Sequence, residues 1–317
     1  MTTTAVLGGT GFVGRALCHA LAEQGHRVLA VARRARPVGP DIAVRELDLA
    51  TAGVDQITDL LAGEDIEVVV NAAGGMWGLT EDQMVAANVT LVDKLIAALG
   101  GLRSAGSGSA RSGAAGPRLV QIGTVHEYGV TPIGTPISED TVPDPVMPYG
   151  ALKLRCTEAI TAAVRAGRID ALTLRIGNIV GPGQPGTSLL GVVAAQLHAA
   201  DRAGTPAELD LGPLGSLRDF VGLTDAVDAI IAAVTTPAAG RPVINIGRGV
   251  ATTAREMVRL LIDASRVPTQ LNEAPASGAE TTWQQMDITL AHDVLRWSPI
   301  HELTKEMKEL WEHQVRL

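Results

Sequence analysis

Three side chains in the middle of the chain could act together on a carbonyl group. Tyr149 lies four residues before Lys153, a spacing that places both side chains on one face of a helix. An ammonium beside a phenol favours the phenolate, which eases proton transfer near neutral pH. Thr124, within QIGTVHEYG at 121–129, ends an apolar segment, and its hydroxyl can hydrogen-bond a reacting oxygen. We therefore expect Thr124, Tyr149 and Lys153 to be catalytic.

A second group of residues predicts a dinucleotide site. In LGGTGFVG, Gly8, Gly11 and Gly14 stand between a predicted strand and a predicted helix. Glycines in this context permit a tight turn and let backbone N–H groups approach a pyrophosphate at the positive end of the helix. The alternative is a glycine-rich turn that holds no ligand.

The end of the next predicted strand indicates which nicotinamide cofactor is used. A ribose with a free 2′-hydroxyl is usually bound by an acidic residue there, whereas this chain has Ala32 followed by Arg33 and Arg34. A guanidinium can pair with a 2′-phosphate in bidentate fashion, so NADP(H) is favoured over NAD(H). A solvated loop is the alternative for the two arginines. Asp48, after the third strand, either accepts from the adenine amine or caps a helix.

The elements that position these residues alternate between strands and helices. Apolar segments predict strands at 4–9, 26–32, 42–47, 66–74, 117–124 and 169–178. Helical spacing of apolar residues predicts helices at 12–24, 54–63, 81–99 and 148–166. This alternation predicts an α/β fold with a doubly wound parallel Rossmann sheet.

The regular alternation loosens after residue 177. We expect a dinucleotide-binding Rossmann domain at 1–177 and a smaller C-terminal substrate lobe at 178–317, with roughly 218–249 returning to the Rossmann sheet. The second half predicts a strand at 241–247 and helices at 187–200, 225–235, 252–265, 288–295 and 301–315. Residues 100–118 are rich in Gly, Ser and Ala and predict a flexible surface insertion.

Composition excludes several classes of protein. A net charge of −8 argues against a nucleic-acid partner, and no apolar run approaches the ~20 residues that span a bilayer. The N-terminus has no signal-peptide pattern, so we expect a cytoplasmic protein without a membrane partner. Cys18 and Cys156 have no neighbours at metal-binding spacing. They are expected to be small core residues, and no metal site is predicted.

Six motifs carry a family resemblance: GGTGFVG, NAAG, IGTVHEYG, YGALK, LRIGNIVGPG and RDFVGLTDAVDA. Their order and spacing resemble the extended short-chain dehydrogenase/reductases, the NAD-dependent epimerase/dehydratase family, over nearly the whole chain. The resemblance implies a homodimer, a nucleotide-sugar substrate held by the smaller lobe, and catalysis by the three residues already selected. It also implies further cofactor contacts from Thr10, Phe12, Leu49, Ala72 and Ala73.

Four residues are candidates for binding the substrate. The resemblance matches Arg218 to an arginine that contacts the substrate diphosphate, and an intramolecular pair with Asp219 or a neighbour is the alternative. Asn178 matches a residue that positions the substrate or the junction of the lobes. Trp77 either flanks the substrate or packs internally. The fourth candidate is His126.

The chain departs from the family's pattern at one substrate contact. Gln284 and Gln285 stand near the place where the family often has a second phosphate-binding arginine. The diphosphate contact is then either weaker or supplied by Arg255.

Val125 and His126 follow the catalytic hydroxyl at positions that help to set the reaction in the family. The 4,6-dehydratases have Asp and Glu there, and valine cannot donate a proton, which argues against dehydration. The 3,5-epimerizing members use a proton-transferring side chain at the position of His126. Histidine could serve in that role, or it could only hydrogen-bond the substrate.

Together with Arg33, these residues favour NADPH-dependent reduction of a 4-keto nucleotide sugar, such as a dTDP-4-keto-6-deoxyhexose, with Tyr149 as general acid. One alternative is a nucleotide-sugar epimerase, with transient hydride transfer or proton transfer assisted by His126. A second alternative is a non-catalytic NADP(H)-binding sensor.

Overall fold

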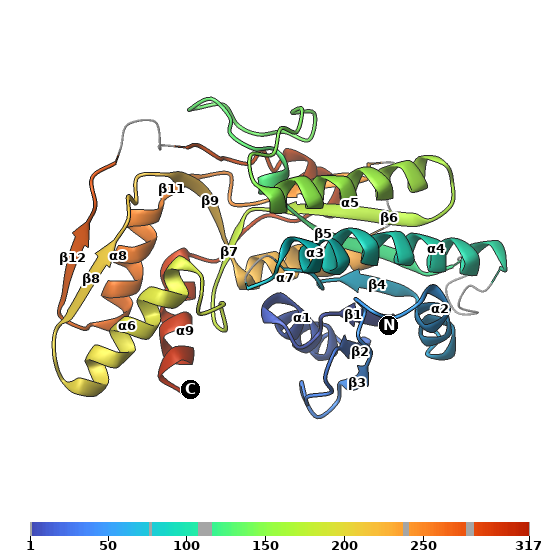
Figure 1. The fold of residues 1–317 in the computed structure, drawn as a ribbon, viewed down its shortest axis with the longest axis horizontal. Helices are drawn as coiled ribbons and strands as arrows, with labels where there is room; N and C mark the ends of the chain where they lie inside the picture. The colour runs from blue at the N-terminus through green and yellow to red at the C-terminus, as the bar shows by residue number, and fades with distance from the viewer. Residues whose placement is uncertain (1, 76–77, 107–115, 237–240, 277–281, 317) are drawn as a thin grey trace.

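A seven-stranded parallel sheet forms the centre of the computed structural model, which describes residues 2–75, 78–106, 116–236, 241–276 and 282–316 (Figure 1). The strand order is β10-β6-β5-β4-β1-β2-β3, and every neighbouring pair is parallel. The order reverses between β1 and β4, which opens a crevice beyond their carboxyl ends. The sheet confirms the predicted doubly wound fold. Its strands are β1 (Thr3–Leu7), β2 (Arg27–Ala32), β3 (Ala43–Glu46), β4 (Val68–Asn71), β5 (Arg118–Thr124), β6 (Asp170–Ile176) and β10 (Val243–Ile246).

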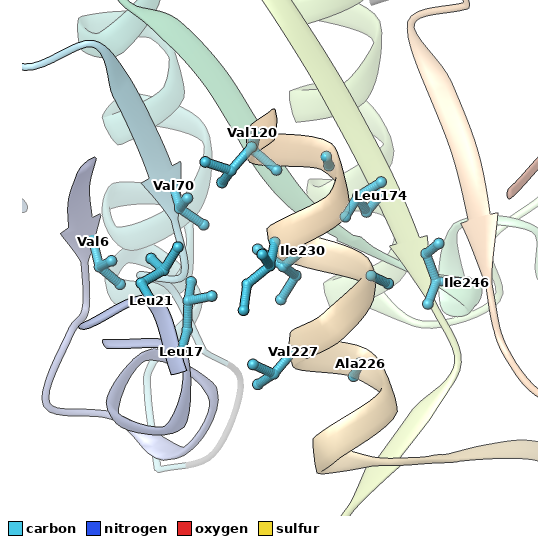
Figure 2. Packing of buried hydrophobic residues seen from close by; sticks show 14 of the residues in the cluster. Val6, Leu17, Leu21, Val70, Val120, Leu174, Ala226, Val227, Ile230 and Ile246 are labelled. Atoms are coloured by element: carbon cyan, nitrogen blue, oxygen red, sulfur yellow. The ribbon is translucent and has the colours of Figure 1, made fainter. Parts of the chain in front are cut away.

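Helices cover both faces of this sheet. On one face, α1 (Phe12–Glu23) and α7 (Leu223–Thr235) pack on strand residues such as Val6, Val70 and Val120 (Figure 2). On the other face lie α2 (Val54–Gly63), α4 (Leu91–Ser104) and α5 (Pro148–Arg165). Because both faces are covered, the central strands are apolar on both sides, as in parallel sheets generally.

The helix before β5 is longer than expected. It begins as α3 (Glu81–Val85), passes through a π-helical turn (Ala86–Thr90) and continues as α4 to Ser104. The predicted insertion at 100–118 therefore begins too early, because Leu102 extends the buried helical stripe of Leu95 and Leu99. Residues 107–115 of that prediction lie outside the described residues.

Over residues 81–104 this helix is long and apolar enough to cross a membrane, judged by length and composition alone. Half of its most apolar window is buried, and Leu95 and Leu99 are fully buried against the sheet. This burial explains the apolar composition of the helix, which packs in the core against the central sheet.

Beyond β6 the chain forms a smaller lobe, on the left in Figure 1. Its core lies among α6 (Leu189–Ala203), α8 (Ala254–Ser265) and α9 (Leu303–Val315). The sequence predictions missed five short strands here, and the predicted helix at 288–295 contains a π-helical turn, Ala291–Leu295. The missed strands are β7 (Asn178–Val180), β9 (Leu217–Gly222) and β11 (Ala251–Thr253) in one sheet, and β8 (Ala207–Leu211) with β12 (Thr269–Glu273) in another.

The chain crosses between the two parts more than once. After β7, α6 and β8, the chain returns through β9 to α7 and β10, which belong to the larger unit. The division at 177/178 stays a prediction.

Candidate active site

Thr124 and Lys153 are brought together at the carboxyl end of β5. Thr124 is the last residue of the strand, and Lys153 lies in the second turn of α5. The Lys153 Nζ donates to the carbonyl oxygen of Ile122 at 2.6 Å, two residues before Thr124. Both side chains are buried, with 8% of Thr124 and 4% of Lys153 exposed. Tyr149, four residues before Lys153, is half-buried in the first turn of α5.

The hydroxyl of Thr124 is oriented by the turn that follows it. Residues Val125–Glu127 form a 3-10 turn, and the Thr124 Oγ1 accepts a hydrogen bond from the N–H of His126 at 3.3 Å. A hydroxyl that accepts in this way keeps its own proton for another partner. Thr124 can therefore donate to an oxygen of a substrate.

Tyr128 is held in the core. It is 1% exposed, and its hydroxyl donates to Asn245 Oδ1 at 2.7 Å. The guanidinium of Arg175 lies 4.4 Å from the centre of its ring, and burial raises the pKa of this phenol. Tyr149 is therefore the tyrosine available to the crevice.

The imidazole of His126 is within range of the positive charge of Arg218, which lies on β9. Burial lowers the pKa of His126, and the positive charge of Arg218 lowers it further. The imidazole is therefore kept neutral near pH 7, so that it can either accept or donate a hydrogen bond.

Arg218 has no carboxylate partner among the residues that the structure describes. Its Nη1 donates to the backbone oxygens of Leu217, at 2.9 Å, and Thr282, at 3.2 Å. The alternative pairing with Asp219 is wrong, because that carboxylate accepts instead from the backbone N–H groups of Arg248, Gly249 and Met286. A half-buried guanidinium without a counter-charge is suited to an anionic ligand.

The other predicted substrate contacts differ in their placement. Asn178 Nδ2 donates to the backbone oxygen of Asp219 at 3.3 Å, which ties β7 to β9. Arg255 makes a bidentate pair with Glu273 at 2.6 and 2.7 Å, so its guanidinium already has an acidic partner. Trp77 lies outside the described residues.

The two glutamines that replace the expected arginine make backbone contacts. Gln284 Nε2 donates to the carbonyl oxygen of Gly129 at 3.0 Å, and Gln285 Nε2 donates to that of Gly249 at 2.8 Å. Gln284 thus joins its segment to the loop after β5, and Gln285 joins it to the loop after β10.

The glycine-rich turn has the geometry of an anion cradle. Gly8 has a φ of +76°, and a Cβ there would lie 2.8 Å from the carbonyl oxygen of Ala72. A Cβ on Gly14 would lie 2.2 Å from the carbonyl oxygen of Gly8. Gly11 is the N-cap of α1, and no side chain caps that helix, so its first N–H groups are available to a ligand. These features fit a dinucleotide pyrophosphate.

A cavity of about 580 Å³ lies beside this turn, lined by Thr10, Arg15, Arg33, Arg34, Arg36 and Asp48. Four guanidinium groups around one cavity fit a phosphate better than a ribose hydroxyl. Sequence reasoning missed two of the four, Arg15 and Arg36. Arg15 directly follows Gly14, and its place on α1 beside the glycine turn was the available signal.

The remaining cofactor candidates differ in their placement, and Asp48 is the one of them that lines this cavity. Asp48 Oδ1 accepts from the N–H of Ala50 at 3.1 Å and closes a local turn, whereas the N-cap of α2 is Gly53. The helix-capping alternative for Asp48 is therefore wrong for that helix. Leu49 is buried in the core. Phe12, the first residue of α1, is partly buried against the hydrophobic cluster between the sheet, α1 and α7.

Buried polar residues behind the crevice were also missed. Asn71 Nδ2 donates to Gln121 Oε1 at 2.8 Å, which joins the end of β4 to the middle of β5. Asn71 Oδ1 accepts from the N–H of Ala73 at 3.2 Å and so fixes the backbone of Ala72 and Ala73 beside Gly8. The signal was a polar residue that closes the apolar run VVVN.

Known proteins match this chain over most of its length. The profile of the NAD dependent epimerase/dehydratase family matches residues 4–247. A dTDP-6-deoxy-L-talose 4-dehydrogenase (NAD(P)(+)) from Kitasatospora kifunensis is 50% identical over 313 residues, covering 98% of this chain and 95% of that protein. A UDP-glucose 4-epimerase from Mycolicibacterium smegmatis is 27% identical over 308 residues, covering 93% of each. The structure of MoeE5 in complex with UDP-glucuronic acid and NAD has a TM-score of 0.81 at 25% identity and covers 99% of both chains.

Proposed function

Because the chain belongs to the NAD dependent epimerase/dehydratase family and is an NAD(P)-dependent enzyme of the extended short-chain dehydrogenase/reductase type, we propose that it reduces the C4 ketone of a dTDP-4-keto-6-deoxyhexose. The observation that carries the proposal is the placement of Tyr149 on α5, one turn before Lys153. The Lys153 side chain is hydrogen-bonded to Ile122 of β5, two residues before Thr124. The substrate class follows the relative from Kitasatospora kifunensis, whose name describes the same carbon and the opposite direction. A 6-deoxy-L-talose derivative is then the product to look for first.

The reaction adds a hydride to C4 and a proton to the oxygen, which turns the ketone into a secondary alcohol. NADPH, when bound, supplies the hydride. Thr124 donates its free hydroxyl proton in a hydrogen bond to the ketone oxygen and holds it in place. Tyr149 gives that oxygen its proton. Lys153 uses one of its three N–H donors on Ile122, and its positive charge stabilises the phenolate that forms.

We assign NADPH as the preferred cofactor. The support is the cavity lined by Arg33 and Arg34, to which Arg15 and Arg36 contribute further positive charge. A 2′-phosphate in this cavity would make charge-assisted hydrogen bonds that a 2′-hydroxyl cannot make. The relative at 50% identity is described as using both cofactors, so a preference rather than an absolute requirement is expected.

The substrate lies between the two parts of the chain in this proposal. Arg218 binds the diphosphate, because its guanidinium is half-buried and bonded only to backbone oxygens in the described structure. His126, neutral beside it, hydrogen-bonds the sugar. We further propose a cytoplasmic homodimer, as the family resemblance implies.

The second candidate is a nucleotide-sugar epimerase, with transient hydride transfer or with proton transfer assisted by His126. The proton-transfer form is favoured by the half-buried position of His126 within the turn that follows Thr124, where a neutral imidazole can remove a proton from carbon. Incorporation of solvent deuterium at a sugar carbon, lost in His126→Gln, would support it. The sensor alternative is disfavoured because Thr124, Tyr149 and Lys153 are all retained.

The decisive experiment mixes the purified protein with NADPH and a panel of dTDP-4-keto-6-deoxyhexoses and follows the absorbance of the reduced cofactor. Stoichiometric NADPH consumption that disappears in Tyr149→Phe is the expected result. Interconversion of epimers without net NADPH consumption would refute the reductase and favour the epimerase. Tight NADPH binding without either reaction would favour the sensor.

A further inference from the structure

A buried acidic residue contacts the backbone of the catalytic threonine. Glu127 is 0% exposed, and its Oε1 accepts from the N–H of Thr124 at 3.0 Å. A Cβ on Gly123 would lie 2.7 Å from the same oxygen, so the glycine leaves room for the carboxylate in its present position at this end of β5. The proposed mechanism gives Glu127 no contact with substrate or cofactor.

The other oxygen of this carboxylate is equally engaged. Glu127 Oε2 accepts from Arg175 Nε at 2.8 Å, and the Arg175 side chain is 5% exposed. Arg175 lies on β6, where it is paired in register with Gly123. The carboxylate therefore joins the turn after β5 to the neighbouring strand through one fixed geometry.

Further buried groups hold Arg175 in place. Its guanidinium stacks on Tyr128, whose hydroxyl donates to Asn245 on β10 at 2.7 Å. Asn245 in turn donates from its backbone N–H to Glu139 at 2.8 Å. The ends of β5, β6 and β10 are thus connected through polar side chains immediately behind the crevice.

We infer that Glu127 is a positioning residue, which holds Thr124 through its backbone so that the hydroxyl faces the reacting oxygen, with Arg175 as its fixed anchor. This inference rests on the proposed catalytic role of Thr124. A buried ion pair gives no more stability than well-packed apolar residues of the same size. What the Glu127–Arg175 pair supplies is a defined geometry next to the hydroxyl, which catalysis requires to within a fraction of an ångström.

The chain offers a matched control on the same two strands. At the amino end of β5, the buried Arg118 lies 3.5 Å from Asp170 of β6 and donates to the carbonyl oxygens of Ala233 and Thr236. Arg118→Gln removes a buried charge from β5 at the end that is remote from the crevice. Its effect should be confined to stability.

The first experiment measures backbone hydrogen exchange of the full-length protein without any ligand. In Glu127→Gln the new amide still offers one oxygen, but its NH₂ group opposes the Arg175 N–H. The peptide spanning 121–128 should then exchange at least ~10-fold faster, whereas Arg118→Gln should leave it unchanged. Equal protection of this peptide in Glu127→Gln and wild type would overturn the inference.

The second experiment measures steady-state reduction with NADPH and the 4-keto sugar. Glu127→Gln should lower kcat by roughly 10–100-fold and leave KM and the NADPH Kd within about twofold. The double variant Glu127→Gln/Arg175→Met also removes the anchor, so its kcat should stay close to that of Glu127→Gln, because the two residues act as one unit. An unchanged kcat in the single variant, or a folded double variant at least ~10-fold slower than Glu127→Gln, contradicts the inference.

Two precautions keep the outcomes distinct. If Glu127→Gln does not fold, Arg175→Lys takes its place in the experiment, because lysine keeps the positive charge but loses the Nε contact to Glu127. A kcat of Arg175→Lys equal to that of wild type then overturns the inference. Wild-type protein that consumes no NADPH refutes the proposed function, while the exchange experiment tests the positioning of Thr124 without substrate.

Discussion

The carbonyl oxygen of His126 lies against the α-carbon of Gly150, so closely that a Cβ at position 150 would come within 2.4 Å of it. Gly150 is the residue after Tyr149, and His126 is two residues after Thr124. This contact therefore docks the first turn of α5 directly on the turn after β5. It explains how a tyrosine and a threonine that are 25 positions apart (149 − 124) can be held at one site.

Gly150→Ala should lower activity by moving α5 away from β5. The added methyl group meets a backbone oxygen that cannot swing aside, and overpacking of this kind costs about 1–3 kcal/mol of stability. We expect kcat to fall by ~10-fold or more, because Tyr149 moves with the helix. Steady-state kinetics and thermal unfolding test this.

Gly101→Ala is the control for that substitution. Gly101 lies inside α4, and a Cβ there would meet no atom within 4 Å. It should keep full kcat and gain about 0.5–1 kcal/mol of stability from its higher helix propensity. Normal activity in Gly150→Ala would show that the contact with His126 does not position Tyr149.

Arg33→Ala should weaken NADPH far more than NADH. Loss of charge-assisted hydrogen bonds to the 2′-phosphate is worth roughly 1.5–3 kcal/mol, or about 10–100-fold in Kd, and NADH has no such phosphate. Titration with both cofactors measures the ratio. Arg45→Ala is the matched control, since Arg45 is exposed on β3 and paired with Glu64. Equal weakening of NADPH and NADH would exclude the assignment of the 2′-phosphate to this cavity.

Much of this site follows from local sequence patterns. The parallel sheet was predictable because strands such as β2 and β4 are nearly continuous apolar runs, and the glycine turn because Gly8 must adopt a positive φ between strand and helix. The Tyr149–Lys153 pair follows from helical periodicity. Each of these signals is contained within a few consecutive residues.

Long-range contacts supply the remainder, and short windows of sequence do not contain them. The strands of the smaller lobe are three to six residues long and pair with partners far along the chain, as Leu217–Gly222 pairs with Asn178–Val180. Glu127 could not be recognised because its partner Arg175 is 48 residues away. The backbone partners of Arg218 likewise include one from residue 282.

His126 should titrate below its ordinary value of about 6.5. Burial and then the charge of Arg218 lower its pKa in the folded protein, so protons bind the unfolded chain more readily. The free energy of unfolding therefore includes a favourable contribution from His126 above about pH 6.5. This contribution is lost as the pH falls from about 6.5 through the lower pKa of the folded protein. An NMR titration, with the signal assigned through His126→Gln, measures the folded value. In Arg218→Gln the pKa should rise, and in Arg255→Gln it should not change. A wild-type value at or above 6.5 would contradict the arrangement of these two residues.

Arg218→Gln should raise the KM for the nucleotide sugar by roughly 10–100-fold, because a charge-assisted contact to the diphosphate is worth about 1.5–3 kcal/mol. The change should leave kcat and the NADPH Kd nearly unaltered, since the interaction is made equally in the ground and transition states. Arg255→Gln is the control, because the Arg255 guanidinium is already paired with Glu273. Kinetics with the same sugar should show a normal KM for Arg255→Gln. If instead Arg255→Gln raises KM and Arg218→Gln does not, the diphosphate is bound by Arg255 in the first turn of α8, and the place given to Arg218 is wrong.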